Sequence, residues 1–211
     1  MYPKNPVRAS LTIEKSEFIC YLFECHDVEE YKEYLNAVKK KHYDATHHCS
    51  AFIAPNIKRS SDDGEPAGTA GVPILNTLEK RGLNNTLAIV VRYFGGIKLG
   101  AGGLIRAYGN ATSNALDQAE LVEDVEINEY QLTLPYDLAN KIDYFLRSQT
   151  DIEDTNYDVE VTYTYLTNSD LEAKILEYTK GISPKLIGTK TLQKLVNKWC
   201  IIKVWKTSYQ F

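Results

Sequence analysis

A glycine-rich segment contains several residues of this chain that could bind a ligand. The stretch RYFGGIKLGAGGLIRAYG, residues 92–109, holds six of the twelve glycines among the 211 residues. Glycine loses much backbone entropy on folding, so such a cluster indicates positive φ angles or a close approach of another group. A β-branched run, 86–93, precedes it and a helical pattern, 104–121, follows it. A strand, loop and helix in this order can direct backbone N–H groups at an anion. Tight packing between the strand and the helix is the alternative.

The established phosphate-loop motifs do not occur in this segment. A dinucleotide loop would need glycine at 105, where Ile105 stands, and no G-x-x-x-x-G-K-[ST] is present. Basic residues nevertheless occur in the same segment. We therefore predict a ligand-facing surface for RNA phosphates or a ribosomal partner. Its expected residues are Arg92, Gly95, Gly96, Lys98, Gly100, Gly102, Gly103 and Arg106.

A histidine-rich segment, HYDATHHCSAF at 42–52, offers a second type of chemistry. In a strand, His47 and Cys49 would share one face and His48 would point to the other. Histidines with a thiol and a carboxylate could form a zinc site or a general base with a nucleophile. No recognised metal spacing such as H-E-x-x-H is present. Hydrogen-bonded structural histidines are the alternative, and we predict no metal and no cofactor.

A carboxylate-rich loop follows, with the sequence SSDDGEPAGTAG at 60–71. Its Asp62, Asp63 and Glu65 could hold a divalent ion or perform acid–base chemistry. Turns also favour aspartate and glycine for their backbone geometry alone. The sequence does not determine whether this loop lies near the glycine-rich segment.

Two groups of predicted elements would position these residues. The first contains strands at 11–14 and 18–23, a helix after an Asp27 N-cap with Glu30 in a capping box, and a strand at 47–54. A long polar loop at 55–71 and a short helix ending at Gly82 follow. The second group reads strand, helix, strand, strand, helix, strand, with Asp137 and Ser169 as expected N-caps. This β-α-β-β-α-β order is the ferredoxin-like pattern. We predict an α+β protein with domains at 1–124 and 127–211.

Composition places the chain among ordinary globular proteins. Hydrophobic residues make up 44% and charged residues 25%. No apolar run approaches the ~18 residues of a membrane helix, and no signal-peptide core begins the chain. Four cysteines without a C-x-x-C pair indicate reduced thiols and a cytoplasmic location. The net charge of −4 argues against a strongly basic nucleic-acid binder on average.

The C-terminal stretch differs from this average. No Asp or Glu follows Glu177, and lysines alternate there with Trp199, Trp205, Tyr209 and Phe211. Basic residues with aromatic residues can bind nucleic acid through phosphates and stacking. The alternative is a soluble edge strand or helix in which the lysines prevent aggregation and the aromatic residues are core.

Three ordered segments resemble the YigZ/IMPACT family: YDATHHCSAF, SSDDGEPAGTAGVPIL and LAIVVRYFGGIKLGAGGLIRAYGNA. The resemblance implies a first domain of two α/β layers, of the type seen in a small-subunit ribosomal protein and a translocation elongation factor. It implies a second domain like that factor's last one. Eukaryotic members regulate translation by competing for the activator of an initiation-factor kinase. They carry an additional N-terminal partner-binding domain, which we expect this chain to lack. The resemblance implies no catalytic residue.

Three functional hypotheses follow. The first is a non-enzymatic, translation-associated regulator that binds RNA or a ribosomal partner through the glycine-rich basic surface. The second is a hydrolase or phosphoryl-group enzyme that uses Asp62, Asp63 or Glu65 with His47 or His48. The third is a protein-interaction module without nucleic-acid binding. The physiological ligand, any reaction and the oligomeric state are not determined by the sequence.

Overall fold

The computed structural model describes residues 1–196, and contacts between Cα atoms divide the chain into two compact units. The first unit comprises Met1–Glu123, together with the last two described residues, and the second comprises Asp124–Lys194. In the described part, no helix combines the length and apolar character needed to cross a membrane.

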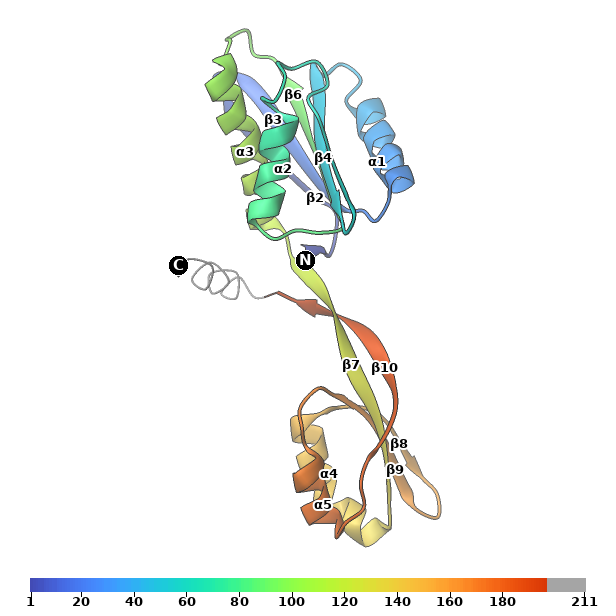
Figure 1. Cartoon of the computed structure of the whole chain (residues 1–211). Coiled ribbons are helices and arrows are strands. Elements are labelled where there is room, and N and C mark those ends of the chain that lie inside the picture. The colour runs from blue at the N-terminus through green and yellow to red at the C-terminus, as the bar shows by residue number, and fades with distance from the viewer. Residues whose placement is uncertain (197–211) are drawn as a thin grey trace. The chain divides into compact units, whose positions relative to one another are not determined.

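An antiparallel sheet of five strands forms the centre of the first unit (Figure 1). Across the sheet the strands are β2 (Val7–Ile13), β3 (Ser16–Glu24), β6 (Thr86–Tyr93), β4 (His47–Ala54) and β5 (Ile57–Ser61). A short strand, β1 (Tyr2–Pro3), pairs with the start of β7 (Leu121–Leu134) instead. The polar loop predicted at 55–71 is therefore wrong at its beginning, because β5 pairs with β4 there as a hairpin.

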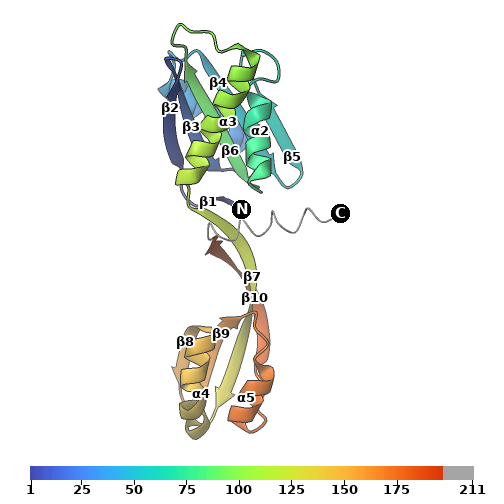
Figure 2. The ribbon, with the colours of Figure 1, turned by 90° about the vertical axis from the view of Figure 1, so that its left-hand side faces the viewer.

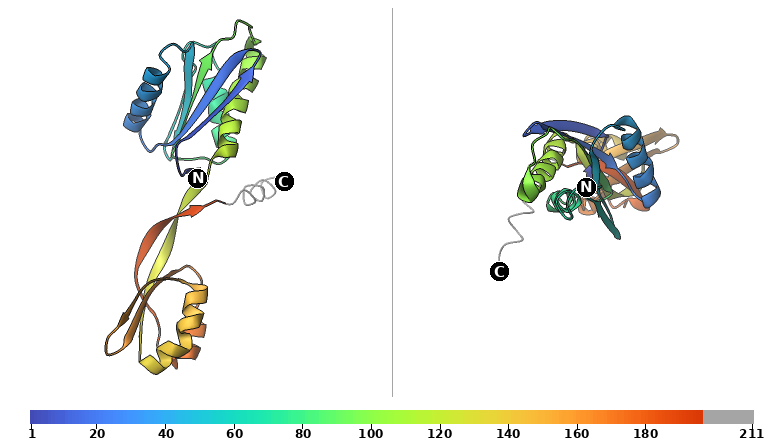
Figure 3. Two further views of the ribbon diagram at one scale, coloured as in Figure 1. Left: turned by 180° about the vertical axis from the view of Figure 1, so that it is seen from behind. Right: turned by 90° about the horizontal axis from the view of Figure 1, so that it is seen from above.

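Helices cover both faces of this sheet. Helix α1 (Val28–Lys41) packs on one face, and α2 (Gly71–Lys80) and α3 (Gly100–Gln118) lie on the other (Figure 3). The first unit has three layers, so the predicted two-layer arrangement is wrong. The run of apolar residues in β6 accounts for the extra layer. Its alternate side chains enter the two opposite cores, and a strand buried on both faces needs a continuous apolar sequence.

The start of α1 agrees with its predicted cap. The Asp27 carboxylate accepts hydrogen bonds from the backbone N–H groups of Glu29 and Glu30, at 2.8 and 2.9 Å. The Glu30 side chain reaches back to the N–H of His26, at 2.8 Å, and not to that of Asp27. Asp27 therefore satisfies two free N–H groups of the first turn, and Glu30 satisfies one N–H group before the helix, as in a capping box shifted by one residue.

The second unit follows the predicted β-α-β-β-α-β order, and its helices lie on one face of the sheet (Figure 2). Its elements after β7 are α4 (Tyr136–Gln149), β8 (Asp151–Tyr157), β9 (Val161–Thr167), α5 (Glu172–Thr179) and β10 (Lys185–Leu195). The strands are arranged β10-β7-β9-β8 across the sheet. The predicted N-caps are wrong here. Asp137 lies in the first turn of α4, and Leu171 precedes α5.

Candidate ligand-binding pocket

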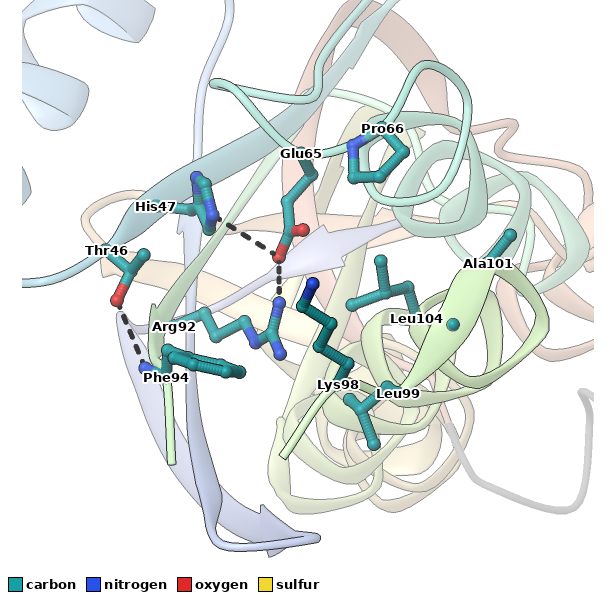
Figure 4. Close-up of a pocket in the computed structure, with 11 residues that line it drawn as sticks. Thr46, His47, Glu65, Pro66, Arg92, Phe94, Lys98, Leu99, Ala101 and Leu104 are labelled. Atoms are coloured by element: carbon teal, nitrogen blue, oxygen red, sulfur yellow. Dashed lines mark hydrogen bonds and ion pairs between the residues drawn. The ribbon is translucent and has the colours of Figure 1, made fainter. Parts of the chain in front are cut away.

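A pocket of 370 Å³ opens in the first unit beside the N-terminus of α3 (Figure 4). It brings together three segments that are far apart in the sequence: the start of β4, the carboxylate-rich loop and the glycine-rich segment. The predicted site residues that line it are His47, Glu65, Arg92, Lys98 and Gly100. Its other lining residues are Thr46, Pro66, Phe94, Leu99, Ala101 and Leu104. The carboxylate-rich loop and the glycine-rich segment therefore share one pocket.

A buried ion pair forms part of the pocket wall. The Arg92 Nη1 atom lies 2.6 Å from Glu65 Oε1, and the two side chains are only 6% and 4% exposed. The guanidinium group also lies over two aromatic rings, with Cζ 5.5 Å from the centre of Phe18 and 5.4 Å from that of Phe94. Arg92 is therefore neutralised and buried. It does not belong to the exposed basic surface expected from the sequence.

One donor of this arginine lacks a protein partner. The Nε atom of Arg92 is buried and makes no hydrogen bond among the described residues. An unsatisfied buried N–H group costs roughly 1–3 kcal/mol, more when it is charged. Such a cost is recovered when a bound water molecule or ligand supplies an acceptor.

Tyr108 and Cys49 lie behind the ion pair. The Tyr108 hydroxyl donates to Glu65 Oε1 at 2.8 Å, and the Cys49 thiol donates to the Asp62 carbonyl oxygen at 2.9 Å. Burial raises the pKa of the Cys49 thiol to about 12. The thiolate is the reactive form, so this cysteine is a poor nucleophile near neutral pH. Tyr108 was not predicted as a site residue, because its only signal in the sequence was its place on the apolar stripe of α3.

His47 presents one ring nitrogen towards the ion pair. Its Nδ1 atom lies 2.9 Å from the carbonyl oxygen of Asp63, which can only accept, so Nδ1 carries a hydrogen. Its Nε2 atom lies 3.8 Å from Glu65 Oε1, and in the neutral ring this nitrogen is an acceptor. Glu65 Oε2 makes no hydrogen bond with a described residue. The pocket therefore contains two acceptor atoms, one from each side chain.

Asp62 lies outside the pocket and holds the loop onto α2. Its carboxylate accepts hydrogen bonds from the backbone N–H groups of Gly68, Ala70 and Gly71, at 2.8, 3.0 and 2.8 Å. Burial opposes ionisation, but these three donors outweigh it and lower the pKa of Asp62 below its usual value. The last two donors belong to the start of α2, where no other side chain provides a cap.

Asp63 and His48 point away from the pocket. The Asp63 carboxylate accepts from the backbone N–H of His48 at 2.7 Å and from Lys39 Nζ at 3.0 Å. Burial opposes its ionisation, but these two donors lower the pKa of Asp63. The His48 Nε2 donates to the carbonyl oxygen of His42 at 2.9 Å. His47 and His48 thus point to opposite faces of β4, as the alternation of a strand predicts.

The glycines of the loop have different roles. A Cβ atom at Gly95 would lie 1.9 Å from the carbonyl oxygen of Lys15, so glycine is needed there for packing. Gly96 and Gly100 have φ angles of +86° and +67°, which disfavour other residues. A Cβ atom at Gly102 would meet nothing within 4 Å. Packing therefore explains Gly95 but does not explain Gly102.

The N-terminus of α3 has no side-chain cap. Leu99 occupies the N-cap position and makes no capping hydrogen bond. The first N–H groups of a helix lack intrahelical acceptors and favour an anion. Exposed basic and apolar side chains occur in the loop before this helix and in its first two turns, with Phe94, Ile97 and Ile105 at 46%, 38% and 46% exposure. We call Phe94, Ile97, Lys98, Ile105 and Arg106 the loop surface.

The other predicted binding region is described only in part. The aromatic residues Trp199, Trp205, Tyr209 and Phe211 lie outside the described residues, as does Cys200. Lys190 in β10 is bonded to Glu129, at 2.9 Å, and to Glu153, so this lysine is paired with carboxylates. Within residues 1–196, no group of three or more His, Cys, Asp and Glu side chains is arranged to hold a metal ion.

Comparison with known proteins identifies a family to which this chain is similar. The profile of the Impact N-terminal domain matches residues 14–116. The IMPACT family member YvyE of Bacillus subtilis is 42% identical over 89% of this chain and 90% of its own length. The IMPACT family member YigZ of Escherichia coli is 36% identical over 86% and 94%, respectively.

A solved structure supports the fold. The crystal structure of a hypothetical protein aligns with a TM-score of 0.57 and 32% identity, over 93% of this chain and 97% of that one. The two-domain translational regulator Yih1 aligns with a TM-score of 0.33 and 20% identity, over 56% and 46% of the two chains. A likeness as low as this second one carries no weight for fold or function.

Proposed function

Because this chain belongs to the IMPACT family, we propose that it is a cytoplasmic, translation-associated regulator that binds RNA through the loop surface. The family resemblance supports the link to translation, since its eukaryotic members regulate that process. The chemistry of the loop surface supports RNA as the partner. The proposed activity is binding, with no reaction assigned to the chain.

The uncapped N-terminus of α3 is the observation that carries this proposal. The backbone donors there and the dipole of a 19-residue helix favour a phosphate group. Gly102 leaves the approach to these donors open, since no neighbouring atom occupies the space of a Cβ. Lys98, which lines the pocket, and Arg106, in the second turn of α3, are both exposed and can pair with further phosphates. Phe94 adds an exposed ring on which a base can stack.

This binding mode depends on the basic residues of the loop surface and not on the net charge of the chain. The net charge of the chain is −4, so long-range attraction to RNA is weak. No base-reading motif accompanies the loop surface, and phosphate contacts carry little sequence information. We therefore expect the loop surface to bind single strands with a marked salt dependence and modest sequence preference.

We also propose a domain type for each of the two units. We propose that the second unit is a ferredoxin-like domain, because its element order and its strand order β10-β7-β9-β8 fit that pattern. We propose that the first is the α/β domain type of the ribosomal protein and the elongation factor, with α1 as an additional layer. The boundary between the two domains falls near residues 122–128.

A salt series tests the phosphate contacts. Lys98→Gln with Arg106→Gln should flatten the slope of log K against log salt by about 1.4, because each single-strand phosphate contact contributes about 0.7. The measurement is fluorescence anisotropy of a labelled single-stranded RNA. The control is Lys40→Gln with Lys80→Gln, which removes two exposed lysines that do not line the pocket. Tight binding without salt dependence, or an equal effect of the control, would contradict the proposal.

The hydrolase and the protein-interaction module are the two alternative functions, and a different result would favour each of them. The hydrolase hypothesis has less support, because Asp62 and Asp63 are bonded to backbone groups outside the pocket. It retains His47 and Glu65, and turnover in a broad screen of phosphate and acyl esters would favour it. Absence of RNA binding even at low salt would favour the protein-interaction module.

A further inference from the structure

Two acceptor atoms of the pocket have no donor among the described residues. The Glu65 side chain is 4% exposed and that of His47 is 19% exposed. Glu65 Oε1 already accepts from Arg92 and Tyr108, at 2.6 and 2.8 Å. Its Oε2 atom and the Nε2 atom of neutral His47 are left without a donor among the described residues. Neither atom is among the fully buried atoms without a partner, so each is open to water or to a ligand that presents N–H groups.

The pocket walls favour a flat, apolar surface on that ligand. Pro66, Leu99 and Leu104 line the pocket together with Phe94. One face of the Phe94 ring is turned to the Arg92 guanidinium, 5.4 Å away, and the ring is still 46% exposed. A nucleobase has the planar face that stacks on such a ring.

The remaining groups at the pocket favour an anion. Gly100 and Ala101 bring the uncapped start of α3 to the pocket. Lys98 also lines the pocket (Figure 4). Arg92, which is also in the wall, has a buried Nε donor without a partner. The ligand therefore combines N–H donors, a flat apolar face and an anionic group. A nucleotide has all three.

We propose that this pocket binds one unpaired guanine nucleotide, either free or within an RNA strand. Guanine presents two adjacent donors, N1–H and the exocyclic amine, on its Watson–Crick edge, and both can donate to the one free oxygen of Glu65, Oε2. Adenine and cytosine present a single amine beside an acceptor, which would face that carboxylate unfavourably. The phosphate lies at the start of α3 and the base lies against Phe94. The inference rests on the proposed function, since it names the nucleotide that the loop surface would take.

Free nucleotides test the pocket without changing the protein. The full-length chain is titrated with 5′-GMP, 5′-IMP and guanosine, and its amide resonances are followed by NMR. IMP lacks the exocyclic amine and should bind about ten-fold more weakly, which is the loss of one hydrogen bond to a charged acceptor. Guanosine lacks the phosphate and should shift the amides of Gly100, Ala101 and Gly102 least. Equal binding of GMP and IMP would overturn the guanine assignment.

A matched pair of variants tests the stacking contact. Phe94→Ala should weaken GMP binding about ten-fold, in line with the loss of one stacked base. Tyr43→Ala is the control, because Tyr43 is an aromatic residue that is 85% exposed and does not line the pocket. A similar effect of both variants on GMP binding would overturn the proposed placement of the base.

The same titration separates this inference from the proposed function. Salt-dependent RNA binding without any GMP-induced shift at the pocket would reject the nucleotide pocket and leave the RNA-binding surface in place. Absence of both would reject the two proposals together. If GMP binds and displaces labelled RNA, the pocket takes a nucleotide of the strand. If GMP binds without displacing RNA, its ligand is a free nucleotide.

Discussion

At the residue scale, the ion pair of Glu65 and Arg92 shapes the wall of the pocket. Both side chains are almost fully buried, so each charge is stable there only because the other neutralises it. Two aromatic rings hold the guanidinium group, and Tyr108 holds the carboxylate. The pair therefore positions the one remaining carboxylate oxygen toward the pocket.

A double-mutant cycle measures this coupling. Glu65→Leu or Arg92→Met alone should lower the free energy of unfolding by about 3–5 kcal/mol, because each leaves a buried charge unpaired. The double variant should be destabilised by clearly less than the sum of the two, in urea unfolding followed by circular dichroism. Lys58 and Glu79 form an exposed control pair, at 61% and 38% exposure, whose loss should cost less than about 1 kcal/mol. Additive losses at Glu65 and Arg92 would show that the pair is not coupled.

At the scale of elements, the glycines between β6 and α3 serve two purposes. One allows close packing, and another leaves the backbone of α3 open to a ligand. Gly95 is pressed against the hairpin between β2 and β3, where Lys15 leaves no room for a side chain. Gly102 lies in the first turn of α3, and a Cβ atom there would have open space around it. Alanine in a helix is more favourable than glycine by about 1 kcal/mol, so stability alone would favour alanine at 102.

Two alanine variants should therefore act in opposite directions. Gly95→Ala should destabilise the first unit by about 1–3 kcal/mol, because the backbone of the hairpin must move. Gly102→Ala should leave the melting temperature unchanged or raise it slightly, while it weakens RNA binding at the start of α3. Thermal unfolding and the anisotropy titration measure the two effects. Unchanged RNA affinity of Gly102→Ala would show that no ligand approaches this backbone closely.

At the scale of the whole molecule, each unit has a hydrophobic core of its own. The second unit buries Leu132, Ile142, Leu146, Tyr163 and Tyr165 between its sheet and its two helices. A domain of roughly 70 residues can fold alone, although with a small margin of stability. The first unit divides its core between the two faces of its sheet.

Independent folding of the second unit is thus a testable prediction. Residues 124–194 expressed alone should give a well-dispersed amide spectrum, because the core residues and both helices are all retained. Resonances from Leu132, Ile142 and Tyr163 should superpose on those of the full-length chain. A collapsed spectrum would show that the second unit needs the first in order to fold.

Local patterns in the sequence were enough to predict most elements and several of their ends. The Asp27 cap, the strand at 47–54 and the order of the second unit each depend on residues close together in the chain. The family resemblance was confirmed for the same reason, because its motifs are ordered local segments. The opposite orientations of His47 and His48 followed from strand alternation alone.

Long-range packing was decided only in the tertiary structure. Arg92 and Glu65 are 27 residues apart, and Tyr108 is 43 residues from Glu65, so no local pattern pairs them. Asp62 and Glu65 are near neighbours in the sequence, yet one caps a helix and the other enters the pocket. The third layer likewise depends on where α1 finds an apolar face to cover. The sequence alone determined which residues are candidates for binding a ligand. The tertiary structure decided which of them share the pocket, because the partners that position a charged group or a hydrogen-bond donor lie far away along the chain.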